Sequence, residues 1–173
     1  MDQYDEAKQI CKEMVSDRGY TMIIAENPES FTAQNHDNTS DMIHVQIIRN
    51  SKVNIRHATD LISILAKSKI KNAIVIYGDS VTPSTVKLID DTRNVKIQLF
   101  NVDELQFNIT KHVLQPVFRK ITAEEYLEMK RFNINKFPKM SKRDAICKYY
   151  NFNPGDLIEI SDQNEITRYR LVI

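Results

Sequence analysis

The spacing of apolar residues predicts that the chain begins with an amphipathic helix followed by an extended segment. Residues 4–18 place five apolar side chains on one helical face: Ala7, Ile10, Cys11, Met14 and Val15. Gly19 follows directly, as expected where a helix ends in a left-handed residue. Residues 20–25 are short and apolar and predict a strand, whereas the polar residues 26–40 predict a loop.

From residue 42 onward, extended and helical patterns alternate. Residues 42–49 and 95–100 predict strands, and 72–77 is a continuous apolar run typical of a strand covered on both faces. Two helices are predicted between these strands, at 59–69 with Thr59 as N-cap and from Thr82–Pro83 to about Asp90. Because helical crossovers join parallel strands, residues 1–110 are predicted to form an α/β domain.

The remaining residues, 111–173, predict a smaller α+β domain with a terminal β-hairpin. Thr122 and Glu125 form a capping box for a helix at 123–132, and Ser141 and Asp144 introduce a second helix that ends near Tyr150. A strong turn signal, Asn153–Asp156, comes next. Two strands, 157–161 and 166–172, are then expected on either side of the polar loop 162–165.

Charge separates the same two regions. The chain of 173 residues has 24 basic and 23 acidic residues. Residues 1–110 hold 12 basic and 15 acidic residues, and residues 111–173 hold 12 basic and 8 acidic residues. The near-neutral total does not favour a free-standing nucleic-acid binder, which normally shows a basic excess.

The cysteines and the first residues of the chain indicate the cellular compartment. Cys11 and Cys147 are far apart and form no CxxC pair, which argues against a disulfide framework or a zinc ribbon. The acidic start, Met1–Glu6, is neither a signal nor a transit peptide, and no apolar run is long enough to cross a membrane. We therefore expect a soluble intracellular protein without membrane partners.

A search for catalytic motifs finds no convergent chemistry. With only 3 glycines, the chain cannot build a dinucleotide or Walker-type phosphate loop, and its four histidines form no metal-ligand spacing. The His36–Asp37 pair lies in a polar loop and is better explained as solvated. The sequence thus predicts no enzyme activity, no cofactor, no metal and no small-molecule substrate.

Two alternatives involve nucleic acid. A nuclease would need an acid-x-Lys metal site, but Glu6–Lys8 and Glu128–Lys130 both fall on predicted helices, and Asp90–Asp91 fits a solvated helix end. A free-standing DNA-binding regulator would use the second helix of the smaller domain. That helix carries Lys142, Arg143 and Lys148, which could meet phosphates.

Aromatic residues and arginine near the C-terminus favour a protein interface. Tyr149, Tyr150 and Phe152 precede Pro154–Gly155, and Arg168–Arg170 lies on the last predicted strand. The aromatic residues fit the domain's own core equally well, and a small domain leaves room for both uses.

Several motifs in order resemble the fifth subunit of eukaryotic nuclear RNA polymerases, whose C-terminal part is similar to a small subunit of the archaeal RNA polymerase. The matching stretches run along nearly the whole chain: Lys12–Tyr20, Ile74–Tyr77, Val81–Ser84 with Lys87–Leu88, Phe100–Asn101, Asn108–Pro116, Pro154–Asp156 and Tyr169–Val172. The chain departs from the family in three places. Residues 26–57 are shortened, Val117–Phe118 replaces basic residues, and Pro138–Met140 lacks an arginine. It resembles a divergent member, from a large DNA virus or an AT-rich eukaryote.

The resemblance implies a non-catalytic polymerase subunit that acts in transcription. Its C-terminal domain would dock on the largest subunit and help assembly, and its N-terminal domain would form part of the lower jaw beside downstream duplex DNA. Thr82, Pro83 and Ser84 would lie nearest the DNA. The docking residues would be Pro116, Pro138, Tyr149, Pro154, Gly155, Tyr169 and Arg170. A cellular subunit would be nuclear, and a viral one would be in the host cytoplasm or the virion.

Overall fold

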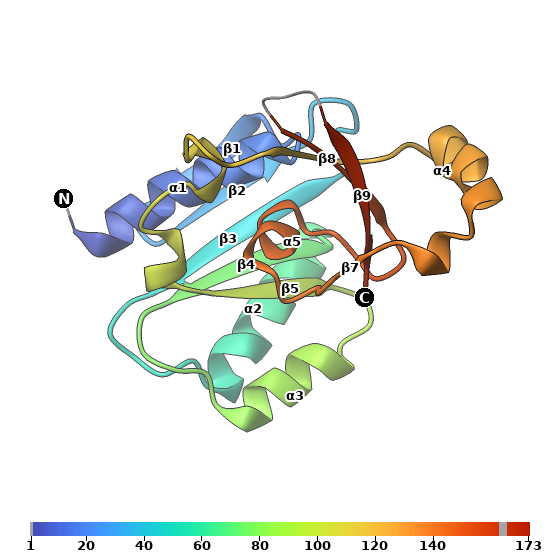
Figure 1. Ribbon diagram of the computed structural model, residues 1–173. Coiled ribbons are helices and arrows are strands. Elements are labelled where there is room, and N and C mark those ends of the chain that lie inside the picture. Colours follow the sequence, from blue (N-terminus) through green and yellow to red (C-terminus); the bar gives the residue numbers. More distant parts are fainter. Residues whose placement is uncertain (1, 163–165) are drawn as a thin grey trace. The chain divides into compact units, whose positions relative to one another are not determined.

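A computed structural model describes residues 2–162 and 166–173, and it separates into two compact units (Figure 1). The division falls between Phe107 and Asn108. Each unit has its own sheet and its own hydrophobic core. Both units contain helices and strands, in agreement with the predicted mixed α/β fold class. No helix in these ranges is both long and apolar enough to cross a membrane.

The first unit contains a five-stranded sheet whose strands lie in chain order. β1 and β2 form an antiparallel hairpin, β2 pairs antiparallel with β3, and β3, β4 and β5 are parallel. The strands are β1 (Met22–Asn27), β2 (Ser30–Gln34), β3 (Met42–Ile48), β4 (Asn72–Tyr77) and β5 (Lys96–Asn101). The predicted parallel pairing from residue 42 to residue 100 is therefore confirmed.

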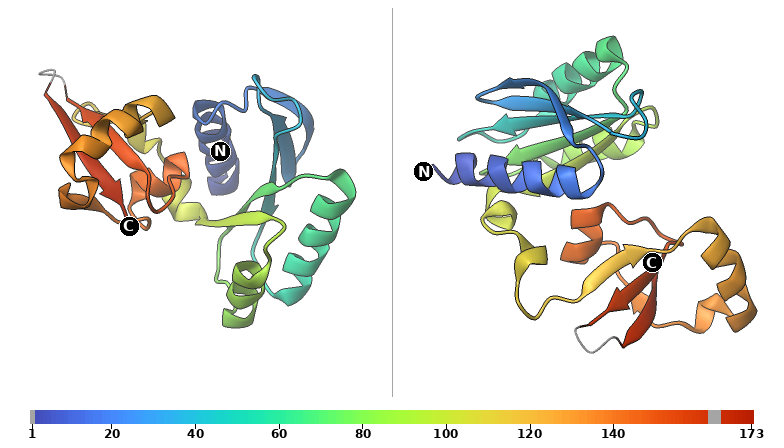
Figure 2. Two further views of the ribbon diagram at one scale, coloured as in Figure 1. Left: turned by 90° about the vertical axis from the view of Figure 1, so that its right-hand side faces the viewer. Right: turned by 90° about the horizontal axis from the view of Figure 1, so that it is seen from above.

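Helices cover both faces of this sheet. α1 (Gln3–Asp17) lies on one face, whereas α2 (Ile55–Ser68) and α3 (Pro83–Asp91) lie on the other (Figures 1 and 2). Ala73 and Val75 of β4 pack in the core cluster beneath α2, while Ile74 and Ile76, which alternate with them, are also buried. Burial on both faces explains why β4 is a continuous apolar run.

The helical patterns at the N-terminus are also confirmed. The buried residues of α1 are Tyr4, Ala7, Cys11, Met14 and Val15. Gly19 adopts a left-handed φ of 93° just beyond the helix, as its position predicted. After β5, the chain forms a 3₁₀ turn, η1 (Val102–Leu105), against α1, and another, η2 (Ile109–Lys111), opens the second unit.

The loop predicted at residues 26–40 is wrong in part, because it contains β2. Phe31 and Ala33 are fully buried, and the polar residue between them, Thr32, shares a hydrogen bond of 2.9 Å with Nδ1 of His44 on β3. The two buried polar side chains thus bond to each other across the strands, while Nε2 of His44 has no hydrogen-bond partner among the described residues. The local composition therefore looked like a loop, although the first four residues of β2 are buried.

The predicted start of the second helix is also wrong, because α2 begins at Ile55. Oδ1 of Asn54 accepts the His57 N–H at 3.2 Å, and Nδ1 of His57 accepts the Asn54 N–H at 3.3 Å. Thr59, the predicted cap, lies inside the helix and donates its hydroxyl to the Ile55 carbonyl at 2.9 Å. Because a histidine takes the place of the usual Glu or Gln, the capping box was not recognisable from the sequence.

The second unit contains a four-stranded sheet in the order β6-β8-β9-β7. β8 pairs antiparallel with both β6 and β9, and β7 pairs parallel with β9. The strands are β6 (Val117–Lys120), β7 (Lys139–Met140), β8 (Leu157–Ser161) and β9 (Thr167–Val172). β6 and β7 were not predicted, because both are short and β6 is largely exposed. Residues 163–165 of the predicted loop lie outside the described residues.

Short helices pack on opposite faces of this second sheet. On one face, Leu157 and Leu171 cluster with residues of α4 (Ala123–Met129) and of the following 3₁₀ turns, η3 (Lys130–Phe132) and η4 (Ile134–Lys136). On the other face, Ile158 and Val172 cluster with α5 (Ala145–Tyr150). α4 has the predicted Thr122–Glu125 capping box, but it is shorter than the predicted helix at 123–132.

A close approach at Gly78 fixes the end of β4 against α1. A Cβ atom added to Gly78 would overlap the Tyr4 hydroxyl and lie 2.9 Å from its Cζ. The Tyr4 ring is buried, and its hydroxyl accepts the Asn50 N–H at 3.2 Å, so the ring has little freedom to move. Only glycine fits at this position without a rearrangement.

We expect Gly78→Ala to lower the free energy of unfolding by about 1–3 kcal/mol, the usual cost of overpacking. Urea denaturation followed by circular dichroism measures the change. Tyr4→Phe in the Gly78→Ala background removes the overlapping hydroxyl and should recover part of the loss, relative to Tyr4→Phe alone. An unchanged unfolding midpoint in Gly78→Ala would show that the approach is not constraining.

Candidate functional site

The groups that were considered for catalysis do not converge. In residues 2–162 and 166–173, no three His, Cys, Asp or Glu side chains gather as a metal site. Lys8 of the Glu6–Lys8 pair is bound instead by Glu26 at 2.9 Å, so it serves the packing of α1 on β1. His36 and Asp37 lie 3.0 Å apart but are almost fully exposed.

The Asp90–Asp91 and Glu128–Lys130 pairs also fail to form a site. Asp90 and Asp91 are exposed in the last turn of α3. Glu128 lies on α4, and Lys130 lies over the ring of Tyr126, with Nζ 5.9 Å from the ring centroid. These positions match the solvated helical surfaces that the pattern favoured.

The residues Thr82–Ser84 form the turn that begins α3. The Thr82 N–H donates to the Val53 carbonyl at 3.0 Å, which holds the turn against the segment before α2. Thr82 is the N-cap residue, as predicted, but its hydroxyl makes no cap bond and instead contacts the Thr85 hydroxyl at 2.7 Å. Pro83 and Ser84 are exposed, so the turn presents a fixed polar edge to solvent.

Two of the predicted docking residues, Pro138 and Tyr169, line the same depression on the second unit. We call this depression the α4 hollow. It has a volume of about 460 Å³, and its walls are Met129, Phe132, Lys136, Phe137, Pro138 and Tyr169. The rings of Phe137 and Tyr169 lie 6.0 Å apart at 58°, and Phe132 is 66% exposed at the edge. The hollow is therefore apolar, open and walled largely by rings.

The two phenylalanines of the α4 hollow were not among the predicted docking residues. Phe132 was predicted as the last residue of the helix at 123–132, and Phe137 was predicted to lie in the break that follows it. The signal that could have indicated them is the stretch 130–139, which combines these two rings with basic residues and contains no acid. Aromatic residues and arginine are enriched at protein interfaces.

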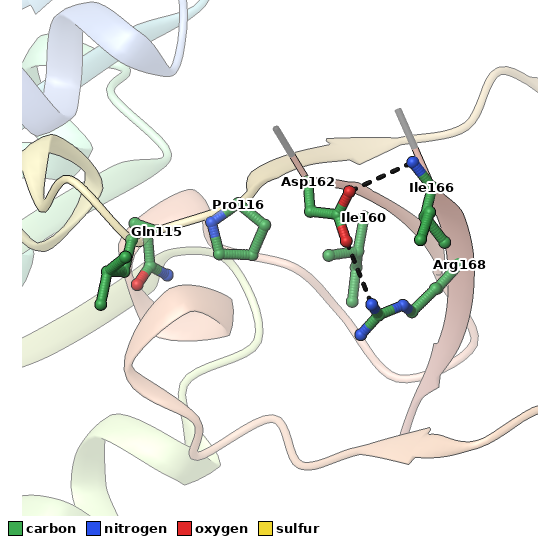
Figure 3. Close-up of a pocket in the computed structure, with 7 residues that line it drawn as sticks. Gln115, Pro116, Ile160, Asp162, Ile166 and Arg168 are labelled. Atoms are coloured by element: carbon green, nitrogen blue, oxygen red, sulfur yellow. Dashed lines mark hydrogen bonds and ion pairs between the residues drawn. The ribbon is translucent and has the colours of Figure 1, made fainter. Parts of the chain in front are cut away.

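Pro116 belongs to a different depression, which Figure 3 shows. This pocket of about 340 Å³ is lined by Leu114, Gln115, Pro116, Ile160, Asp162, Ile166 and Arg168 (Figure 3). Asp162 organises one wall, because its Oδ1 accepts the Ile166 N–H and its Oδ2 accepts Nη2 of Arg168, both at 3.1 Å. The segment before β6 thus runs beside the ends of β8 and β9.

Gly155 lines a third depression, of about 410 Å³, together with residues of α4 such as Tyr126 and Leu127. Pro154 is exposed in the adjacent turn. The Gly155 N–H donates to the Val172 carbonyl at 2.9 Å, and Asp156 pairs with Lys120 at 2.8 Å. This turn is therefore tied to both β9 and β6.

The last two predicted docking residues have different environments. Tyr149 is only 3% exposed, and its ring lies 5.0 Å from that of Tyr150, which stacks on Phe152 at 5.3 Å. These rings pack in the second unit, so Tyr149 could support a docking surface only indirectly. Arg170, by contrast, is exposed on β9, opposite Ile158 of β8.

The basic residues proposed for DNA recognition do not share one helix. Lys142 and Arg143 precede α5, whose N-cap is Asp144, and only Lys148 lies within it. α5 has six residues, and three of them, Ile146, Cys147 and Tyr149, are buried. Such a short, half-buried helix offers little surface to a DNA groove.

An arginine network, missed from the sequence, positions α4 on the sheet. Arg119 of β6 donates to both carboxylate oxygens of Glu125 at 2.8 and 3.0 Å, and to both of Glu159 at 3.2 and 3.0 Å. The Tyr169 hydroxyl donates to Glu159 at 3.2 Å. The network joins β6, α4, β8 and β9. Its member Tyr169 also lines the α4 hollow.

The network also shifts the proton affinities of its members. Hydrogen bonds from Arg119 and from the backbone of Thr122 lower the pKa of Glu125 to about 2. The hydrogen bonds to Glu125 and Glu159 raise the pKa of Arg119. Burial and then the charge of Glu159 raise the pKa of Tyr169. Arg119 therefore remains charged, and Glu125 remains ionised in all but strong acid.

Comparison with known proteins follows the same division of the chain. Residues 107–172 match the family described as RNA polymerase Rpb5, C-terminal domain. The chain is 29% identical over 185 aligned positions to a protein of Invertebrate iridescent virus 6, provisionally named DNA-directed RNA polymerase subunit 454R. That alignment covers 98% of this chain and 99% of the viral protein.

Two eukaryotic relatives are similar over comparable lengths. The chain is 25% identical over 182 positions to the DNA-directed RNA polymerases I, II, and III subunit rpabc1 of Dictyostelium discoideum, covering 93% of this chain and 92% of that one. It is 25% identical over 177 positions to the DNA-directed RNA polymerase V subunit 5A of Arabidopsis thaliana, covering 90% and 79%. The similarity therefore extends across both units.

Acid should weaken the second unit through Glu125. Because its pKa falls from 4.5 to about 2 on folding, its contribution to stability is complete above pH 4.5 and is lost as the pH falls through 2. We expect Glu125→Gln to flatten the fall in unfolding free energy between these values, measured by urea denaturation at stepped pH. Glu124→Gln, at an exposed position of the same helix, should keep the wild-type slope. Equal slopes for Glu125→Gln and wild type would contradict the assignment.

Proposed function

We propose that this chain, a divergent relative of the fifth subunits of eukaryotic-type RNA polymerases, is a non-catalytic subunit of a multisubunit DNA-dependent RNA polymerase. The observation that carries the proposal is the end-to-end similarity to polymerase subunits of a virus, an amoeba and a plant. The family match over residues 107–172 supports it independently for the second unit. A subunit of this kind contributes to transcription through contacts with other subunits, whose active site does the chemistry.

We propose that the second unit docks on the largest polymerase subunit. Its surface favours a protein contact, because large apolar side chains remain exposed on it: Val113, Leu114, Val117, Leu127, Phe132, Ile166 and Ile173. Exposed apolar side chains that gather around depressions mark interaction sites. Pro138 and Tyr169 would contribute from the α4 hollow, Pro116 from its own pocket, and Pro154, Gly155 and Arg170 from the adjoining turn and strand.

We propose that the first unit forms part of the lower jaw, with the Thr82–Ser84 turn nearest the downstream duplex. The turn is held by Val53 and leaves Ser84 exposed, as a fixed contact with a phosphate requires. The acidic excess of residues 1–110 limits this contact. Such a unit guides DNA only within an assembly whose other subunits supply a positive electrostatic potential.

We propose that the protein has the same cellular location as the polymerase to which it belongs. A cellular subunit would be nuclear, and a viral one would be in the host cytoplasm or the virion. The similarity to an iridovirus protein over nearly the full length of both chains supports the viral alternative.

Affinity purification of the tagged chain from its native host, followed by mass spectrometry, tests the proposed function. We expect near-stoichiometric recovery of the two largest polymerase subunits. Recovery of the chain alone, or with chromatin but no polymerase, would refute the proposal. That result would favour the free-standing DNA-binding regulator and its residues Lys142, Arg143 and Lys148.

A photo-reactive probe on the Thr82–Ser84 turn tests the jaw. Ser84→Cys, labelled with an aryl azide and assembled into polymerase on a transcription template, should cross-link to downstream duplex DNA. Ser63→Cys is a matched control, because Ser63 is an exposed serine on α2 of the same unit. Equal cross-linking from both positions, or none from Ser84 in a verified complex, would remove the turn from the DNA path.

A further inference from the structure

The α4 hollow is bordered by a segment that carries basic but no acidic side chains. Residues 130–139 contain four basic residues, Lys130, Arg131, Lys136 and Lys139, and no acidic residue. Lys136 is part of the wall, and Arg131 directly precedes the exposed Phe132 in η3. The hollow therefore has a basic side chain in its wall and others in the adjoining chain segment.

Two of these charges form no ion pair within residues 2–162 and 166–173. Lys139 donates to the Asn135 carbonyl at 2.6 Å, and Lys130 lies over the Tyr126 ring. Neither Arg131 nor Lys136 pairs with a carboxylate in the part of the chain that the structure describes. Glu125 and Glu159, on the same face of the sheet, are both held by Arg119. Arg131 and Lys136 thus remain available to an external partner.

The shape of the hollow selects one large apolar side chain. Its volume of about 460 Å³ lies at the small end of the range for binding pockets, roughly 300–1,000 Å³. The Phe137 and Tyr169 rings form a rigid wall, because Tyr169 is also anchored to Glu159 through its hydroxyl. An aromatic or long aliphatic residue would bury well against such a wall.

We infer that the α4 hollow binds an acidic, hydrophobic segment of the polymerase subunit on which the second unit docks. A large apolar side chain of that segment enters the hollow, and carboxylates beside it meet Arg131 and Lys136. The inference rests on the proposed function and deepens it by stating the chemistry of the partner. Apolar burial supplies most of the affinity, and the charge pairs fix orientation and speed association.

A polypeptide fits this surface better than nucleic acid. Met129 and Pro138 give the walls an aliphatic character that bases do not need, and a single basic residue, Lys136, is among the described residues that line the hollow. A strand of nucleic acid is instead tracked by a continuous basic groove with stacking aromatics. Contact with DNA is nonetheless a distinct outcome of the test below.

Cross-linking from position 132 identifies the occupant. Phe132 is replaced by p-benzoylphenylalanine in the full chain, and the assembled polymerase is purified and irradiated. We expect a cross-link to a polymerase subunit, within a segment that contains at least one large apolar residue beside carboxylates. A cross-link to DNA or to a segment without carboxylates overturns the inference. So does the absence of a protein cross-link from position 132 when the same probe at Val117, which is equally exposed, gives one.

Charge reversal tests the two basic residues separately. Arg131→Glu combined with Lys136→Glu should weaken retention of the chain on purified polymerase by roughly tenfold, with the loss largest at low salt. Lys142→Glu combined with Arg143→Glu is the matched control, since both are exposed basic residues of the same unit. Circular dichroism verifies that both variants are folded. Equal retention of the two variants overturns the inference while leaving the proposed function intact, whereas failure of the wild-type chain to bind polymerase overturns both.

Discussion

The arrangement of the second unit depends on the guanidinium group of Arg119. This planar group donates to Glu125 on α4 and to Glu159 on β8 at the same time. A lysine could supply the charge but not two forks in fixed directions. The side chain is 43% exposed, so the ion pairs add only modestly to stability. Their main effect is geometric, because they determine where α4 lies on the sheet.

The position of α4 in turn defines the surfaces of this unit. Met129 at its end lines the α4 hollow, while Tyr126 and Leu127 line the depression that also contains Gly155. A sheet covered by a seven-residue and a six-residue helix cannot bury all of its apolar side chains. The uncovered remainder collects beside α4 and at the segment before β6. A small domain thus has apolar surface left for a partner because its own helices are short.

Sequence patterns predicted the elements whose apolar spacing or caps are local, such as the face of α1, the doubly covered β4 and the cap of α4. β6 and β7 were missed because their identity comes from pairing with strands distant in sequence. β2 was missed because polar residues such as Ser30, Thr32 and Gln34 hide its buried apolar positions. In the candidate site, the motif resemblance selected Pro138 and Tyr169, which the fold brings together, but it also selected Tyr149, whose ring is buried. It did not select Phe132 or Phe137, because their convergence depends on η3 and η4 turning the chain back toward β9. No local pattern specifies that path.

The two units use their basic side chains differently. In the first unit, Arg49 is enclosed by Asp2, Asp5 and Glu29 and lies over the Tyr4 ring, while Lys8 and Lys12 both bind Glu26. These basic groups hold α1 to the sheet and are not available to a partner. In the second unit, one arginine neutralises two glutamates, which leaves the basic segment beside the α4 hollow without internal acids. In the second unit, basic side chains and exposed apolar surface therefore occur in the same segment, 130–139.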